Sequence, residues 1–148
     1  SSNYKVENSL LKDLVKSHLV LKRFGLTIGI MALNVQPKGL IFDKTYIGVD
    51  YVDPIETANK TAQYLRKQKK CDVVICLSHL GSDAKAAEVN DFQVARESRN
   101  IDVIIGGHSH TMLENATETN LDGRKVVIAQ VGKSGLYLGR IELLVSKK

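Results

Sequence analysis

Hydrophobic residues gather into short runs separated by polar and glycine-containing segments, a pattern typical of a mixed α/β protein. HLVLKRF and LTIGIMAL are two runs of strand character that meet at Gly25, which predicts a hairpin. The opening ENSLLKDLVKS fits a short helix or an irregular connection. The segment NVQPKGLIFDKTYIGVDYV shows no sustained period and predicts a loop with a short edge strand.

The run Asp53–Glu56, with the sequence DPIE, is the clearest local signal for a helix start. It places an acid at the cap, a proline at the first helical position and a glutamate able to return to the cap. The apolar residues that follow at helical spacing predict that one face of this helix packs on a sheet. They are Ile55, Ala58, Ala62 and Leu65.

Two continuous apolar runs, CDVVICLSH and IDVIIGGHSH, are typical of strands buried on both faces. The intervening AAEVNDFQVARESRN has room for one crossover helix around Phe92, Val94 and Ala95. Strand, helix and strand at this separation predict a right-handed βαβ unit with parallel strands. Further along, KVVIAQ and LYLGRIELLV flank the turn GKSG and are expected to pair as a hairpin.

Composition describes one globular domain of 148 residues, with 43% hydrophobic residues and a net charge of +5. No apolar run approaches the roughly 20 residues that cross a bilayer, so no membrane span is expected. The densest basic run, RKQKK at Arg66–Lys70, ends a helical pattern, where cations complement the helix dipole in a solvated end. With only 5% aromatic residues, no nucleic-acid partner is expected.

Two cysteines, Cys71 and Cys76, lie five residues apart in one strand-like run. Residues at that spacing point to opposite faces of a strand, which argues against a local disulfide or metal pair. We expect both to be small buried apolar residues, with a free thiol as the alternative for either.

Three of the four histidines follow predicted strand ends. His79 ends the first buried strand, and His108 and His110 follow the second after a Gly-Gly pair. The carboxyl ends of parallel strands share one edge of a sheet, so these imidazoles are expected to converge. Converging neutral imidazoles are typical metal ligands, although loop histidines bonded to the backbone remain the alternative. His18, on an alternating run without a partner, is expected to be structural.

LSHLG and IIGGHSHT resemble the last two motifs of the calcineurin-like metallophosphoesterases, in particular the 5′-nucleotidase branch that includes the periplasmic UDP-sugar hydrolases. LTIGIMAL near the front and VGKSGLYLGRIEL near the back extend the resemblance over nearly the whole chain. It implies an α/β fold class: half of an αββα metallophosphoesterase sandwich, with a parallel βαβ unit and a C-terminal hairpin.

The resemblance also implies two divalent metal ions, and it does not distinguish between Zn, Mn, Mg, Fe and Ca. By position, His79 and His108 would bind one metal and His110 the other. The implied reaction is hydrolysis of a nucleotide or other phosphomonoester by a metal-activated hydroxide attacking in line. The implied location is periplasmic or extracellular.

The earlier motifs of that family, a D-x-H pair, a metal-bridging Asp and a G-N-H segment, have no counterpart in the sequence. Residues 1–148 are therefore expected to form a single domain, the C-terminal half of the catalytic domain. This half should be inactive alone, complemented by an N-terminal half from the parent protein or a partner chain, and prone to self-association through an exposed seam.

Two other functions stay open: a non-catalytic binding or assembly module that keeps the fold, and a mononuclear zinc hydrolase with three histidine ligands. The chain lacks G-x-G-x-x-G and G-x-S-x-G, which disfavours a dinucleotide-binding protein and a triad hydrolase.

Overall fold

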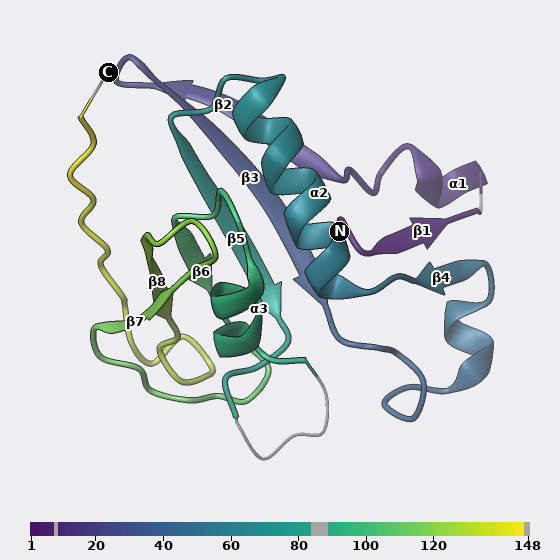
Figure 1. Cartoon of the computed structure of the whole chain (residues 1–148). Coiled ribbons are helices and arrows are strands. Elements are labelled where there is room, and N and C mark those ends of the chain that lie inside the picture. Colours follow the sequence, from purple (N-terminus) through teal and green to yellow (C-terminus); the bar gives the residue numbers. More distant parts are fainter. Residues whose placement is uncertain (8, 84–88, 147–148) are drawn as a thin grey trace.

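The computed structural model describes residues 1–7, 9–83 and 89–146. A six-stranded sheet in the order β2-β3-β5-β6-β8-β7 forms its centre, and a two-stranded sheet, β1-β4, lies to one side (Figure 1). The elements are β1 (Tyr4–Val6), α1 (Ser9–Lys12), β2 (His18–Arg23), β3 (Leu26–Asn34), a 3-10 turn (Asp43–Tyr46), β4 (Val49–Tyr51), α2 (Pro54–Lys67), β5 (Val73–His79), α3 (Asp91–Glu97), β6 (Val103–Ile105), β7 (Ala116–Thr119) and β8 (Lys125–Ala129).

The strand pairings confirm two predictions about the sheet. β2 and β3 form an antiparallel hairpin, whose turn residues Phe24 and Gly25 both have positive φ, at 51° and 74°. Two such residues make the turn that suits the twist of paired strands. β3, β5, β6 and β8 are parallel, and α3 connects β5 to β6 as the expected crossover helix.

The start of α2 follows the sequence signal. The Asp53 carboxylate accepts a hydrogen bond of 2.6 Å from the backbone N–H of Glu56, and Pro54 is the first helical residue. The Glu56 carboxylate does not turn back to the cap but pairs with Lys60, one turn further, at 2.5 Å.

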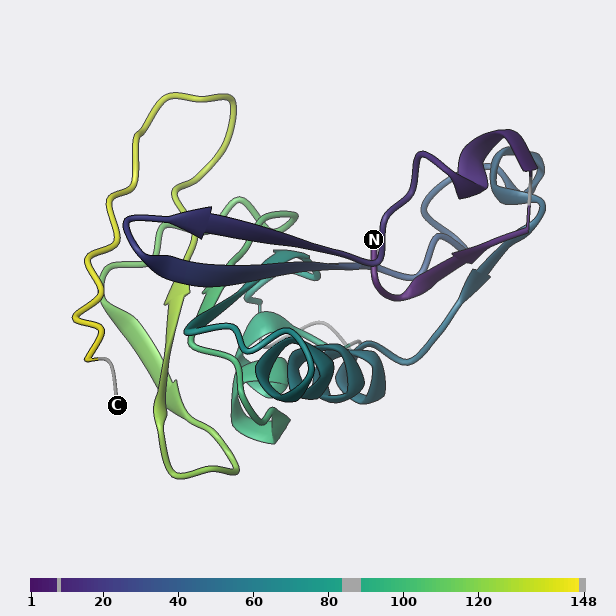
Figure 2. The ribbon, with the colours of Figure 1, turned by 90° about the horizontal axis from the view of Figure 1, so that it is seen from above.

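The core lies between one face of the main sheet and the helices α2 and α3, which Figure 2 shows on the same side of the sheet. α2 packs closely on β3 because Gly29 has no side chain; a Cβ there would lie 3.0 Å from both Leu65 Cδ1 and Cys71 Sγ. Both cysteines are free and buried, as predicted. The largest apolar core residues are Met31, Leu33, Leu65, Ile101, Ile104, Ile128, Val74, Val94, Val103 and Val126.

The opposite face of the sheet is apolar and partly open to solvent. The register places Ala32, Leu77 and Ile105 in one row across three neighbouring strands. Leu77 is 43% exposed and Ile105 is 39% exposed, although both lie on central strands. Because side chains alternate along a strand, Leu77 and His79 share this face. An apolar seam was expected, and we call this surface the open sheet face.

The end of the chain differs from the prediction. β8 forms its hairpin with β7, whereas residues 136–146, which contain LYLGRIELLV, have no strand assigned. β8 is already paired with β6 on one edge and β7 on the other, so β8 itself offers no free edge to this segment. It runs as an extended chain, yellow in Figure 1, in which Leu138 is 98% exposed.

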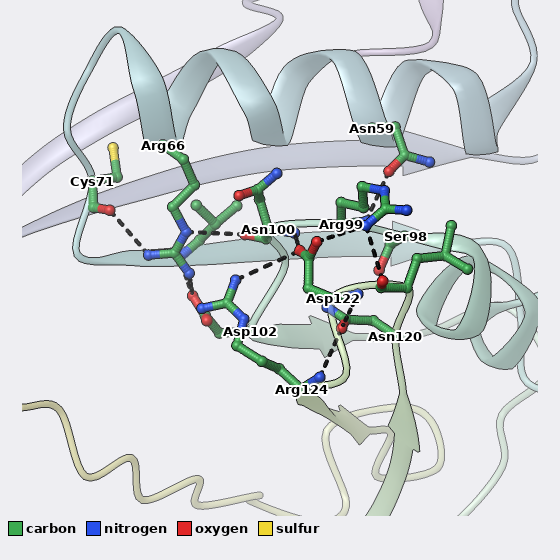
Figure 3. A network of polar contacts seen from close by, with 12 residues as sticks. Asn59, Arg66, Cys71, Ser98, Arg99, Asn100, Asp102, Asn120, Asp122 and Arg124 are labelled. Carbon is green, nitrogen blue, oxygen red and sulfur yellow. Dashed lines mark hydrogen bonds and ion pairs between the residues drawn. The ribbon is translucent and has the colours of Figure 1, made fainter.

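A polar network joins the end of α2 to the amino ends of β5 and β6 (Figure 3). The Arg66 guanidinium donates to the carbonyl oxygens of Cys71 and Asn100, at 3.0 and 3.2 Å, and pairs with the Asp102 carboxylate. The Arg66 side chain is only 15% exposed. The prediction of a solvated helix end is therefore wrong for Arg66, because the Arg66 guanidinium donates hydrogen bonds to carbonyl groups between the helix and the strands.

Candidate metal-binding site

His79 and His108 meet at the carboxyl edge of the main sheet. His79 is the last residue of β5, and His108 follows β6 after the Gly106-Gly107 pair. Their rings lie edge to face with centroids 5.0 Å apart and an angle of 65° between the planes. A Cβ at Gly107 would lie 3.5 Å from His79 Nδ1, so the turn after β6 runs directly past that ring.

The surroundings of His79 favour its neutral form. Partial burial lowers the pKa of His79, and the charges of His108 and His110 lower it further. A neutral imidazole offers a lone pair to a metal ion, whereas a protonated ring does not. His110 therefore lies within electrostatic reach of the pair.

The three histidines do not form a complete metal site. Across residues 1–7, 9–83 and 89–146, no three His, Cys, Asp or Glu side chains gather closely enough to hold a metal ion. The structure thus joins His79 and His108 without adding His110 to the same group. Two imidazoles at an exposed edge fit a divalent cation by their chemistry, but a zinc site needs about four ligands. A mononuclear three-histidine zinc site is not assembled by the described residues.

Ser109 anchors the turn that carries two of the histidines. His108 and His110 both have left-handed backbone conformations, with φ of 69° and 56°, which cost of order 1–3 kcal/mol each in non-glycine residues. Between them, the Ser109 hydroxyl accepts a hydrogen bond of 3.0 Å from the backbone N–H of Ser82, and the two hydroxyl groups lie 3.2 Å apart. The two imidazoles therefore flank an anchored serine and remain exposed.

Gln130, directly after β8, holds the same turn in place through hydrogen bonds. It was not among the predicted site residues. It is 2% exposed, and its Oε1 accepts from the Thr111 backbone N–H at 2.7 Å and the Ser109 hydroxyl at 3.2 Å. Its Nε2 donates to the Ser82 hydroxyl at 3.2 Å. One side chain thus connects β8 with both histidine-bearing turns. The only sequence signal was a polar residue directly after a buried strand, at the edge where ligands collect.

Comparisons with known proteins show which proteins this chain is similar to. No family model matches the chain. The chain is 31% identical over 141 residues to an apyrase from Tabanus yao, covering 84% of this chain and 24% of that protein. It is 29% identical over 126 residues to the trifunctional nucleotide phosphoesterase protein YfkN from Bacillus subtilis, covering 84% and 8%. The solved 5′-nucleotidase precursor from Thermus thermophilus matches with a TM-score of 0.75 at 28% identity, over 88% of this chain and 27% of that one.

The relatives and structural neighbours that match most of this chain are thus 5′-nucleotidases, apyrases and calcineurin-like phosphoesterases, in agreement with the resemblance seen in the sequence. The chain spans 8% and 24% of the length of the two curated relatives above. Within the part of the chain that the structure describes, no helix combines the length and apolar character that a membrane crossing requires.

Proposed function

We propose that this chain supplies histidine ligands to the metal site of a 5′-nucleotidase-like phosphomonoester hydrolase. In this proposal His79 and His108 hold one divalent cation and His110 binds a second. The observation that carries the proposal is the edge-to-face contact of the His79 and His108 rings, 5.0 Å apart at the carboxyl edge of a parallel sheet. The lowered pKa of His79 supports it, because the neutral ring is the form that binds metal.

A divalent cation bound there would supply a Lewis acid for a phosphoryl oxygen. The chain's own contribution is to present the imidazoles in a fixed arrangement. His79 is held by the end of a central strand, and His108 by the turn that Ser109 and Gln130 anchor. A nucleotide or another phosphomonoester is the proposed substrate, and a periplasmic or extracellular location is proposed with it.

We further propose that residues 1–148 act as the C-terminal half of the catalytic domain and that the other ligands come from a second half. The open sheet face supports this arrangement. His79 lies on the same face as Leu77, so a layer that covers Leu77 and Ile105 would also reach the histidine pair. That layer is where the absent D-x-H and G-N-H motifs are expected to lie. The chain alone is expected to have no substantial phosphatase activity.

Metal binding can be tested on the chain itself by titrating Zn²⁺ and following the ring signals of the four histidines by NMR. We expect the His79 and His108 signals to shift together and His79→Ala to weaken binding. His18 is a matched control because its ring packs on Tyr64, with centroids 5.2 Å apart, and His18→Ala should bind Zn²⁺ as the unaltered chain does. Equal Zn²⁺ binding by His79→Ala and His18→Ala would overturn the proposal.

The hydrolase function can be tested with a nucleoside 5′-monophosphate. We expect no phosphate release from residues 1–148 alone, and metal-dependent release from a longer chain that contains the D-x-H and G-N-H motifs. In that longer chain His79→Ala should abolish release while His18→Ala preserves it. Undiminished release by His79→Ala would contradict the assignment.

A further inference from the structure

Asp91, at the start of α3, is an ionisable residue with no exposed surface. Its Oδ1 accepts a hydrogen bond of 2.5 Å from the Ser78 hydroxyl, and its backbone N–H donates to the Gly81 carbonyl oxygen at 2.8 Å. Its Oδ2 is buried and has no hydrogen-bond partner among the described residues. Burial raises the pKa of Asp91 to about 6. A carboxyl group in this position is therefore costly for folding.

The helix does not need this carboxyl group as a cap. Asn90 already fills that role, because its side chain accepts a hydrogen bond of 2.9 Å from the backbone N–H of Gln93. What distinguishes Asp91 is where its carboxyl group lies. One oxygen holds Ser78, which directly precedes His79.

The other oxygen lies against Gly106, the first residue after β6. Any Cβ at Gly106 would overlap Asp91 Oδ2, so the carboxyl group occupies the space that a side chain would need. Gly106 comes two residues before His108. A single buried carboxyl group thus contacts the ends of both strands that carry the paired histidines.

We infer that Asp91 is a positioning residue that sets the relative placement of His79 and His108 through its contacts with Ser78 and Gly106. The consequence for metal binding rests on the proposed function, but the placement of the two rings does not. Side chains that orient metal ligands from behind typically change metal affinity by about 10- to 100-fold when removed.

The test compares Asp91→Ala with Asp91→Asn in the metal-free chain at neutral pH. NMR reports the chemical shifts of the His79 and His108 rings and the nuclear Overhauser effect between them. Asp91→Ala should shift both sets of ring signals and weaken the effect. Asp91→Asn keeps the shape and an oxygen that can accept from Ser78, so it should restore both.

Val94→Ala is the matched control, because Val94 is a core residue of the same helix with 1% exposure. It should lower stability against urea while leaving the ring signals in place. Ring signals that move equally in Val94→Ala and Asp91→Ala would overturn the inference, as would unchanged signals in a folded Asp91→Ala. If Asp91→Ala does not fold, Ser78→Ala removes the hydroxyl that donates to Asp91 Oδ1 and accepts from the Leu80 backbone N–H at 3.2 Å, and it should still move the His79 signals. Unchanged His79 signals there would also overturn the inference.

Zn²⁺ affinity provides a separate measurement. We expect Asp91→Ala to bind Zn²⁺ about 10-fold or more weakly than the unaltered chain, with Asp91→Asn close to normal. If the unaltered chain binds no Zn²⁺, the proposed function fails, and the ring signals still decide the positioning role of Asp91.

Discussion

Replacing Gln130 with alanine removes one side chain that connects three parts of the candidate site. The Gln130 side chain makes three hydrogen bonds, to the Thr111 backbone N–H, the Ser109 hydroxyl and the Ser82 hydroxyl. After truncation, the two serine hydroxyls still lie 3.2 Å from each other, and Ser109 Oγ keeps Thr111 Oγ1 at 2.9 Å. The backbone N–H of Thr111 is the group left without this acceptor.

An unsatisfied donor of this kind costs about 1–3 kcal/mol, and each of the two hydroxyl hydrogen bonds about 0.5 kcal/mol more, at the low end of the usual range because both serines keep other partners. We expect Gln130→Ala to lower the free energy of unfolding by about 2–4 kcal/mol, which raises the unfolding equilibrium constant by about 30- to 1,000-fold. Urea unfolding followed by circular dichroism measures this change as a shift of the midpoint at constant slope.

Lys125→Ala, at an exposed position of β8, is the control and should stay within about 0.5 kcal/mol of the unaltered chain. A Gln130→Ala midpoint indistinguishable from that of Lys125→Ala would refute the reasoning, because it would mean that the buried hydrogen bonds do not stabilise the turn.

Three further predictions concern stability and assembly. Arg66→Ala should lower the free energy of unfolding by about 2–4 kcal/mol, since it removes the donor to the Cys71 and Asn100 carbonyl oxygens and breaks the ion pair with Asp102. Exposed Lys67→Ala should have little effect in the same urea assay. Because the pKa of Asp91 is raised from 3.8 to about 6, the folded state binds its proton more tightly than the unfolded state. The stability that protonated Asp91 contributes is therefore fully present below about pH 4 and is lost as pH rises through about 6, which lowers the free energy of unfolding by up to about 3 kcal/mol. Asp91→Asn should remove this decline. Parallel curves of stability against pH for the two proteins would contradict the prediction. The chain should self-associate through the open sheet face, as measured by size-exclusion chromatography with light scattering. Leu77→Glu should favour the monomer, whereas Phe24→Ser, at the fully exposed hairpin tip, should not. A monomeric unaltered chain at high concentration would count against this prediction.

Local signals in the sequence were enough for the main elements. The hairpin at Gly25 was predictable because its tight turn requires a positive φ, which glycine adopts readily. The start of α2 was predictable because the Asp53 side chain caps the helix and Pro54 has a fixed helical φ. The parallel βαβ unit, from two apolar runs and the helix between them, was enough to bring His79 and His108 to one edge. In each case the deciding interaction lies within a few residues or within one repeating pattern.

The parts that were missed depend on contacts between distant residues. Ser82 and Gln130 are 48 residues apart in the chain, and no spacing rule connects them. Arg66 lies in a sequence typical of a solvated helix end, but in the folded chain Asn100 and Asp102 lie beside its guanidinium group and bury it. The segment LYLGRIELLV has strand composition, but the predicted pairing with β8 needs a free edge on β8, and β6 and β7 occupy both of its edges.

The position of the histidine pair has a consequence for how a complete site would assemble. His79 and Leu77 share the open sheet face, so a layer that covers the apolar surface also removes water from the metal ligands. In the proposed hydrolase, metal binding and the docking of that layer are then linked, because each favours the same closed arrangement. Linkage is reciprocal: if docking strengthens metal binding by some factor, the metal strengthens docking by the same factor. A chain with a solvent-exposed histidine pair should accordingly bind metal more weakly by itself than within the assembled domain.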